Sequence, residues 1–144
     1  GVTERLGVRR GALLVRRGRG GVAEGTEVLL LRCRGGLAHG VVVSGGGRGV
    51  CAEGRPSSWT VLHAQDGWSG STGSPVPGPA LIAEEGLSGA AAAHLQEHLG
   101  AAGEPSAALR GRAEWAVGGL VAEVERGEWS VRSWPPGEAR GWLR

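Results

Sequence analysis

The chain has 144 residues and a formal net charge of +2, and it contains no Lys, Asn, Tyr, Phe or Met. The absence of Lys excludes a Walker-type phosphate loop and a Schiff-base lysine, and the absence of Phe and Tyr excludes the stacking face of a typical RNA-recognition motif. The length fits one domain or two very small ones, and no apolar run approaches the roughly 20 residues of a membrane-spanning helix.

The missing residue types have AT-rich codons, whereas the abundant Gly, Ala, Arg and Pro have GC-rich codons. A very GC-rich coding sequence explains this alphabet, and part of the Arg content then follows from codon usage. A chain translated from a GC-rich non-native reading frame would have the same alphabet and no evolved function. A longer open frame overlapping this one in the coding DNA would support that alternative.

Residues 1–66 alternate short apolar runs with glycine breaks and are rich in Arg. Short Val-rich runs bounded by glycines predict strands joined by tight turns. We therefore expect a basic β-rich segment that forms a small antiparallel sheet and could curl into an SH3-like barrel. The predicted strands are ALLV (12–15), EVLLLRC (27–33), LAHGVVVS (37–44), GVCA (49–52) and WTVLHA (59–64).

The two cysteines, Cys33 and Cys51, both lie in this segment. They are too few for a disulfide scaffold, and no C-x-x-C pair predicts a zinc ribbon. We expect two buried reduced thiols, which favours an intracellular location, although an oxidising compartment would permit one bridge. The chain begins at Gly1 rather than Met, so an upstream targeting segment could have been removed.

Charge is distributed unevenly along the chain. Residues 1–55 hold ten Arg and four Glu, whereas residues 56–144 hold six Arg and ten acidic residues. This asymmetry favours RNA or another polyanion as a partner of the basic half, although one half could instead dock on the other. Guanidinium groups at turns between strands can bind phosphates in bidentate fashion. The candidate polyanion-binding residues are Arg16, Arg17, Arg19, Arg32, Arg34 and Arg48.

Residues 67–80 (GWSGSTGSPVPGPA) predict a linker or exposed loop, because Gly and Ser are flexible and the prolines favour an extended form. Beyond them, residues 81–144 predict a mainly helical segment with a Trp-rich tail. One helix is expected over about 88–101 and a second from Pro105 to about Arg126, where apolar residues recur at helical spacing. The two would form a helical hairpin, so the expected fold class is α+β.

The most specific motif is HLQEH in the first of these helices. It places His94 and His98 one helical turn apart, with Glu97 between them. Two imidazoles at this spacing can bind one metal ion, and the carboxylate lies close enough to activate a bound water. The alternative is a pair of solvent-facing histidines on the flank of an Ala-rich helix.

The same stretch resembles the H-x-x-E-H signature of the inverzincins, the pitrilysin-like and insulinase-like zinc peptidases. The resemblance covers about a dozen residues and includes Ala93 and Gly103 beside the motif. It implies zinc as cofactor, His94 and His98 as ligands, and Glu97 as general base. The third ligand of that family is a glutamate further along the chain, for which the candidates here are Glu123 and Glu125.

Two classes of function therefore remain open from the sequence. The first is a non-catalytic interaction protein without a cofactor, whose Arg-rich turns contact RNA or another polyanion. The second is a zinc-dependent hydrolase centred on the HLQEH helix.

Overall fold

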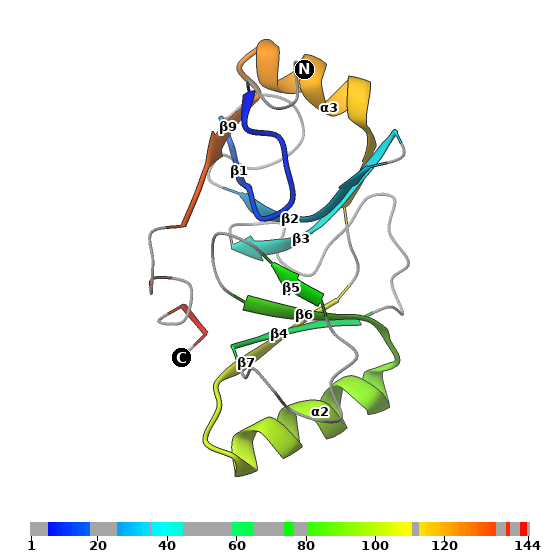
Figure 1. The fold of residues 1–144 in the computed structure, drawn as a ribbon, viewed down its shortest axis with the longest axis vertical. Helices are drawn as coiled ribbons and strands as arrows, with labels where there is room; N and C mark the ends of the chain where they lie inside the picture. Colours follow the sequence, from blue (N-terminus) through cyan, green and yellow to red (C-terminus); the bar gives the residue numbers. More distant parts are fainter. Residues whose placement is uncertain are drawn as a thin grey trace.

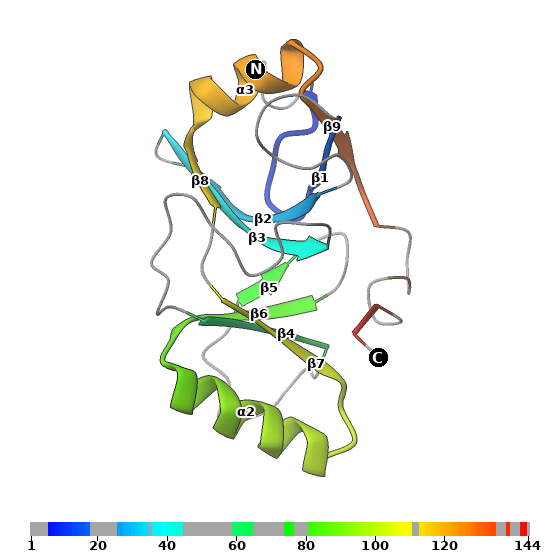
Figure 2. The same ribbon diagram turned by 180° about the vertical axis from the view of Figure 1, so that it is seen from behind.

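The structure, a computed structural model, describes residues 6–17, 26–34, 36–44, 59–64, 74–76, 81–110, 113–134, 138 and 142–143. This part of the chain forms nine strands and two α-helices. Two antiparallel sheets face each other, and one helix covers the outer face of each, so that the layers run helix, sheet, sheet, helix (Figures 1 and 2). The fold class is α+β, as the sequence predicts.

The first sheet has five strands in the order β8-β3-β2-β1-β9. All of its neighbouring strands are antiparallel. Helix α3 (Val117–Glu125) covers its outer face. Its strands are β1 (Leu13–Arg16), β2 (Glu27–Arg34), β3 (Leu37–Ser44), β8 (Ala113–Ala116) and β9 (Trp129–Arg132).

The second sheet has four antiparallel strands in the order β5-β6-β4-β7. Helix α2 (Gly89–Ala101) covers its outer face, and Ser88 caps the helix by accepting a hydrogen bond from the backbone N–H of Ala91 at 3.1 Å. An N-cap serine of this kind stabilises a helix by about 1 kcal/mol relative to alanine. The strands are β4 (Trp59–His63), β5 (Ser74–Val76), β6 (Leu81–Leu87) and β7 (Ser106–Arg110).

Both faces of each sheet are buried. Leu13 and Leu29 of the first sheet pack against Leu62 of the second in the central core, whereas Leu30 faces Leu120 of α3. The burial of each such side chain stabilises the folded state by about 1.5–3 kcal/mol. Burial on both faces explains why β2 and β3 contain continuous apolar runs rather than an alternating pattern.

Most strands predicted in the first half are confirmed by β1, β2, β3 and β4, which begin and end within one residue of the expected bounds. The predicted strand at 49–52 lies outside the described residues. The SH3-like barrel is not formed by the described residues, because both sheets are open and end in the edge strands β8, β9, β5 and β7. Within the predicted linker, Ser74–Val76 forms strand β5, and Val76 is only 1% exposed in the central core.

The prediction of a helical hairpin is wrong. Helix α2 matches the expected helix over 88–101, but the segment from Pro105 to Arg126 forms β7, β8 and the shorter helix α3. Residues 106–110 pair with β4 along its whole length, so tertiary strand pairing overrides the helical spacing of the sequence. Helices α2 and α3 lie on opposite outer faces of the molecule (Figure 2). Neither helix of the described part is long and apolar enough to cross a membrane.

Gly40 permits the close approach of β3 to β2. A Cβ atom at this position would overlap the carbonyl oxygen of Leu29 and would lie 2.9 Å from Cγ1 of Val28. We expect Gly40→Ala to lower the free energy of unfolding by about 2 kcal/mol in urea denaturation, because the two central strands must move apart. Gly100→Ala is the matched control, since that position in α2 has open space around it and should be neutral or slightly stabilised. An equal stability of the two variants would contradict this account.

Candidate functional site

Arg16 is the first of the predicted polyanion-binding residues, and it is buried. Its Nη1 lies 3.8 Å from Glu123 Oε1, and its Nη2 lies 3.5 Å from Glu128 Oε1. The guanidinium also lies 5.2 Å from the ring centroid of Trp129, whose Nε1–H donates a hydrogen bond to Glu123 at 2.9 Å. Arg16 therefore joins the first sheet to the end of α3 and is not presented to a polyanion.

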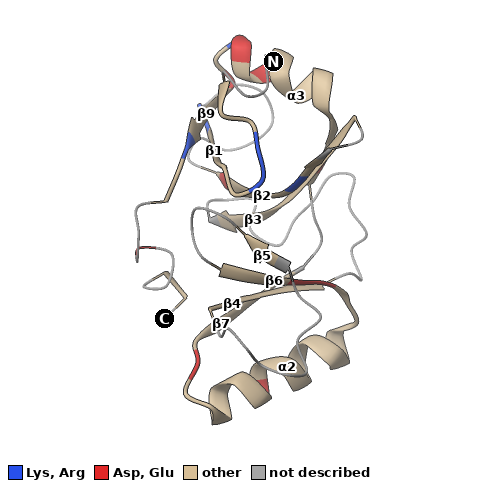
Figure 3. Cartoon of the chain, viewed as in Figure 1, with Lys and Arg blue, Asp and Glu red and all other residues tan. Residues whose placement is uncertain are grey.

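The other described arginines do not form one patch. Arg17 is exposed and donates a hydrogen bond to Ser130 Oγ at 2.8 Å. Arg32 is also exposed, but β1 and β2 are antiparallel, so Arg32 lies at the opposite end of the sheet from Arg17. Figure 3 shows the charged residues spread over several elements. Arg19, Arg48 and the side chain of Arg34 lie outside the described part.

The HLQEH motif lies on the outer face of α2. Ala92, Leu95 and Leu99 form the buried face of this helix, so His94, Glu97 and His98 are exposed. The two glutamates considered as a third ligand lie in α3, on the other side of the molecule, and cannot complete the site. In the part of the chain that the structure describes, no group of three or more His, Cys, Asp and Glu residues is placed to hold a metal ion. The likeness to inverzincins does not extend beyond this helix.

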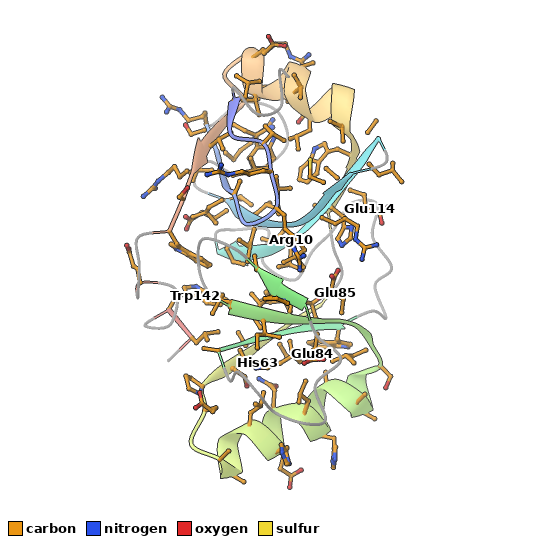
Figure 4. All side chains as sticks on the ribbon, viewed as in Figure 1. Arg10, His63, Glu84, Glu85, Glu114 and Trp142 are labelled. Carbon is orange, nitrogen blue, oxygen red and sulfur yellow. The ribbon has the colours of Figure 1, made fainter. Side chains whose placement is uncertain are left out.

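A buried polar pair that the sequence did not reveal lies between the second sheet and α2. His63 is 0% exposed and Glu84 is 3% exposed, and His63 Nε2 lies 3.1 Å from Glu84 Oε2. Both face α2, because His63 follows Val61 by two residues and Glu84 is the cross-strand partner of Val61 (Figure 4). The signal in the sequence is one His at the end of the apolar strand β4 and two adjacent glutamates within β6.

The surroundings of this pair indicate a structural role. Ser106 lies opposite His63 on β7, but its Oγ accepts a hydrogen bond from Gln96 of α2 at 3.4 Å rather than one from the imidazole. His63 Nδ1 has no hydrogen-bond partner among the described residues. The pair is enclosed beneath α2, so a substrate has no direct route to it.

A second histidine joins the two sheets. His39 Nε2 lies 2.7 Å from Glu85 Oε1, and both side chains are partly buried. Cys33, on the neighbouring strand, is a free thiol, and its Sγ lies 3.8 Å from the carbonyl oxygen of Val8. Burial raises the pKa of the Cys33 thiol, which keeps it protonated and poorly nucleophilic.

One arrangement of described residues that resembles a ligand site is a cavity of about 590 Å³ at the β1–β9 end of the first sheet, which we call the tail pocket. Ligand sites in proteins are concave, largely apolar and of roughly 300–1,000 Å³. The tail pocket falls within this range, and it combines aromatic rings with a few charged groups. Its lining residues are Leu13, Glu27, Arg132, Trp134, Glu138 and Trp142.

The tail pocket is built by the C-terminal segment against the first sheet. Leu13, on the face of β1 that meets the second sheet, pairs with Arg132 of β9. The rings of Trp134 and Trp142 lie 5.6 Å apart between centroids, tilted by 40°, and both pack against the central core. Leu143 is buried in the same core. The lining residues come from β1, β2, β9 and the C-terminal tail, so no short sequence motif predicts the pocket.

The described elements thus define a four-layer α+β sandwich with a pocket of ligand size at one end. No protein-family model matches the chain, and no curated protein matches it significantly. Among solved structures, the chain is similar to the X-ray crystal structure of protein DIP2367 from Corynebacterium diphtheriae, with a TM-score of 0.60 and 17% sequence identity. The likeness covers 93% of this chain and 83% of that chain, and at this identity it shows the fold alone.

Proposed function

We propose that the protein is a non-catalytic binding protein whose tail pocket takes a small ligand with a flat apolar body. The observation that carries this proposal is the pair of half-buried indole rings, Trp134 and Trp142, on the wall of a 590 Å³ cavity. Offset or tilted rings bind flat apolar groups well, and each ring supplies a large contact area. Leu13 also lines the same cavity.

The lining supports binding rather than catalysis. Among the described residues, it consists of apolar side chains, two carboxylates and one guanidinium, and none of these lining residues is Ser, Cys, Thr or His. Two His–Glu pairs among the described residues lie outside this lining: His63 with Glu84 is enclosed beneath α2, and His39 with Glu85 joins the two sheets. An interaction protein is also the first of the two classes that the sequence leaves open. The polyanion partner stays a prediction that rests on exposed residues such as Arg17 and Arg32.

Binding can be tested by NMR on the indole N–H groups of the whole protein. The probes are four small molecules with a phenyl body: L-phenylalanine, phenethylamine, 3-phenylpropionate and neutral 3-phenylpropanol. We expect at least one of them to shift the signals of Trp134 and Trp142 saturably, with a dissociation constant at or below about 1 mM. Single Trp→Leu variants assign the signals.

Trp115 provides the internal control, because it packs edge-on against Trp129 under α3, 5.9 Å between centroids, and lies away from the pocket. Its signal should stay in place. Trp142→Ala should abolish the saturable shift of the Trp134 signal. Its urea denaturation midpoint should show that the variant is still folded under the conditions of the NMR experiment. Shifts of equal size at all indoles, or none at the two pocket indoles, would refute the proposed function.

A further inference from the structure

We infer that the ligand of the tail pocket is a zwitterion, with a carboxylate that binds Arg132, an ammonium group that faces Glu27 and Glu138, and an apolar body against the two tryptophans. This inference rests on the proposed function and names the class of ligand. It follows from the charged groups among the described lining residues and from the guanidinium of Arg132, which has no partner among the described residues.

Arg132 presents an uncommitted guanidinium to the pocket. The residue is exposed and lines the cavity, and its side chain makes no hydrogen bond or ion pair with the residues that the structure describes. Other arginines nearby are engaged, since Arg16 contacts two glutamates and Arg17 donates to Ser130. A guanidinium binds a carboxylate through two parallel N–H donors, which makes a ligand carboxylate its best-matched partner.

Glu27 and Glu138 supply the opposite charge to the same cavity. Glu27 begins β2 opposite Val15, and Glu138 comes from the tail and is exposed. Two carboxylates in the lining favour a cationic group on the ligand, and the faces of Trp134 and Trp142 attract a cation as well. The pocket therefore carries complementary groups for both ends of a zwitterion.

Ligands of a single charge fit this lining less well. An anion would pair with Arg132 but would also lie near the carboxylates of the described lining, which disfavour a second negative charge. A cation would pair with Glu27 or Glu138 but would cover the guanidinium of Arg132 without giving it a partner, and a polar group that loses water without gaining a partner weakens binding. A zwitterion avoids both penalties.

Three of the NMR probes differ only in their charged groups. L-Phenylalanine carries both groups, phenethylamine lacks the carboxylate, and 3-phenylpropionate lacks the ammonium. We expect L-phenylalanine to bind roughly tenfold more tightly than either, because each lost charged contact costs about that factor. Arg132→Gln should weaken L-phenylalanine roughly tenfold without weakening phenethylamine, whereas Glu138→Gln should weaken both of these without weakening 3-phenylpropionate.

The outcomes separate this inference from the proposed function. If phenethylamine, 3-phenylpropionate or 3-phenylpropanol shifts the Trp134 and Trp142 signals at least as tightly as L-phenylalanine, the pocket binds ligands but the zwitterion is wrong. If none of the four shifts them, both proposals fail together. Arg132 and Glu138 are exposed, so the two variants should fold, and an unchanged urea midpoint verifies this.

Discussion

Glu84→Ala is expected to lower the free energy of unfolding by about 3–5 kcal/mol, which is a large part of the 5–15 kcal/mol that a domain usually has. Glu84 Oε2 is the hydrogen-bond partner of His63 Nε2 at 3.1 Å. His63 is fully buried, and its Nδ1 already has no partner among the described residues. The substitution would leave the imidazole without the contact it has, between a sheet and a helix that exclude water.

The loss has two physical parts. A buried polar group that loses its partner costs about 1–3 kcal/mol, because it gave up its hydrogen bonds to water on folding. The truncated side chain also leaves a cavity beside Val61 and α2, and cavities in packed regions add to the cost. Because β4 lies between β6 and β7 in the sheet, local collapse around the cavity would disturb both neighbouring strands.

Urea denaturation followed by circular dichroism measures this effect, and two controls separate its parts. Glu84→Gln keeps the shape and one acceptor oxygen, so it should cost only about 1 kcal/mol. Glu97→Ala removes an exposed carboxylate from the outer face of α2 and should change stability by less than about 0.5 kcal/mol. If Glu84→Ala unfolded at the same urea concentration as Glu97→Ala, the buried pair would have no structural role.

The central strands could be predicted from the sequence because their signals are local. The glycine pairs and the Val-rich runs predict β2 and β3 within one residue, and the Ala-rich stretch after Ser88 predicts α2 equally well. β7 could not be predicted in this way. Its residues SAALR have a composition that suits a helix, and the strand forms because β4 offers a complete pairing edge to residues 106–110.

The candidate sites show the same division between local and distant information. The metal-binding spacing of HLQEH is contained within five residues, yet its histidines are exposed on the outer face of α2. The tail pocket joins Leu13 and Glu27 to Arg132 and the tail tryptophans, more than a hundred residues away along the chain, so it becomes apparent only when β1 pairs with β9. Trp enrichment in the tail was the one signal that could have drawn attention to it.

Arg16→Met is expected to lower the free energy of unfolding by about 2–3 kcal/mol, whereas Arg17→Met should change it by less than about 0.5 kcal/mol. The two residues are neighbours in the sequence, but successive side chains of a strand point to opposite faces. Arg16 is 6% exposed and contacts Glu123, Glu128 and the ring of Trp129. Its removal leaves two partly buried carboxylates close together. Arg17 faces solvent, and its side chain donates a hydrogen bond to Ser130 Oγ.

The same pair of variants decides between a structural role and the polyanion-binding role that the sequence suggests for both arginines. If both contacted RNA phosphates, each variant would weaken binding to a homopolymeric RNA by a similar factor at low salt, and each would reduce the salt dependence by about one phosphate contact. The buried position of Arg16 predicts instead that Arg16→Met changes the urea midpoint and leaves RNA affinity, where any is found, equal to that of the wild type. Loss of RNA binding by Arg16→Met at unchanged stability would contradict the structural role, because a buried guanidinium held between Glu123 and Glu128 cannot reach a phosphate without breaking those contacts.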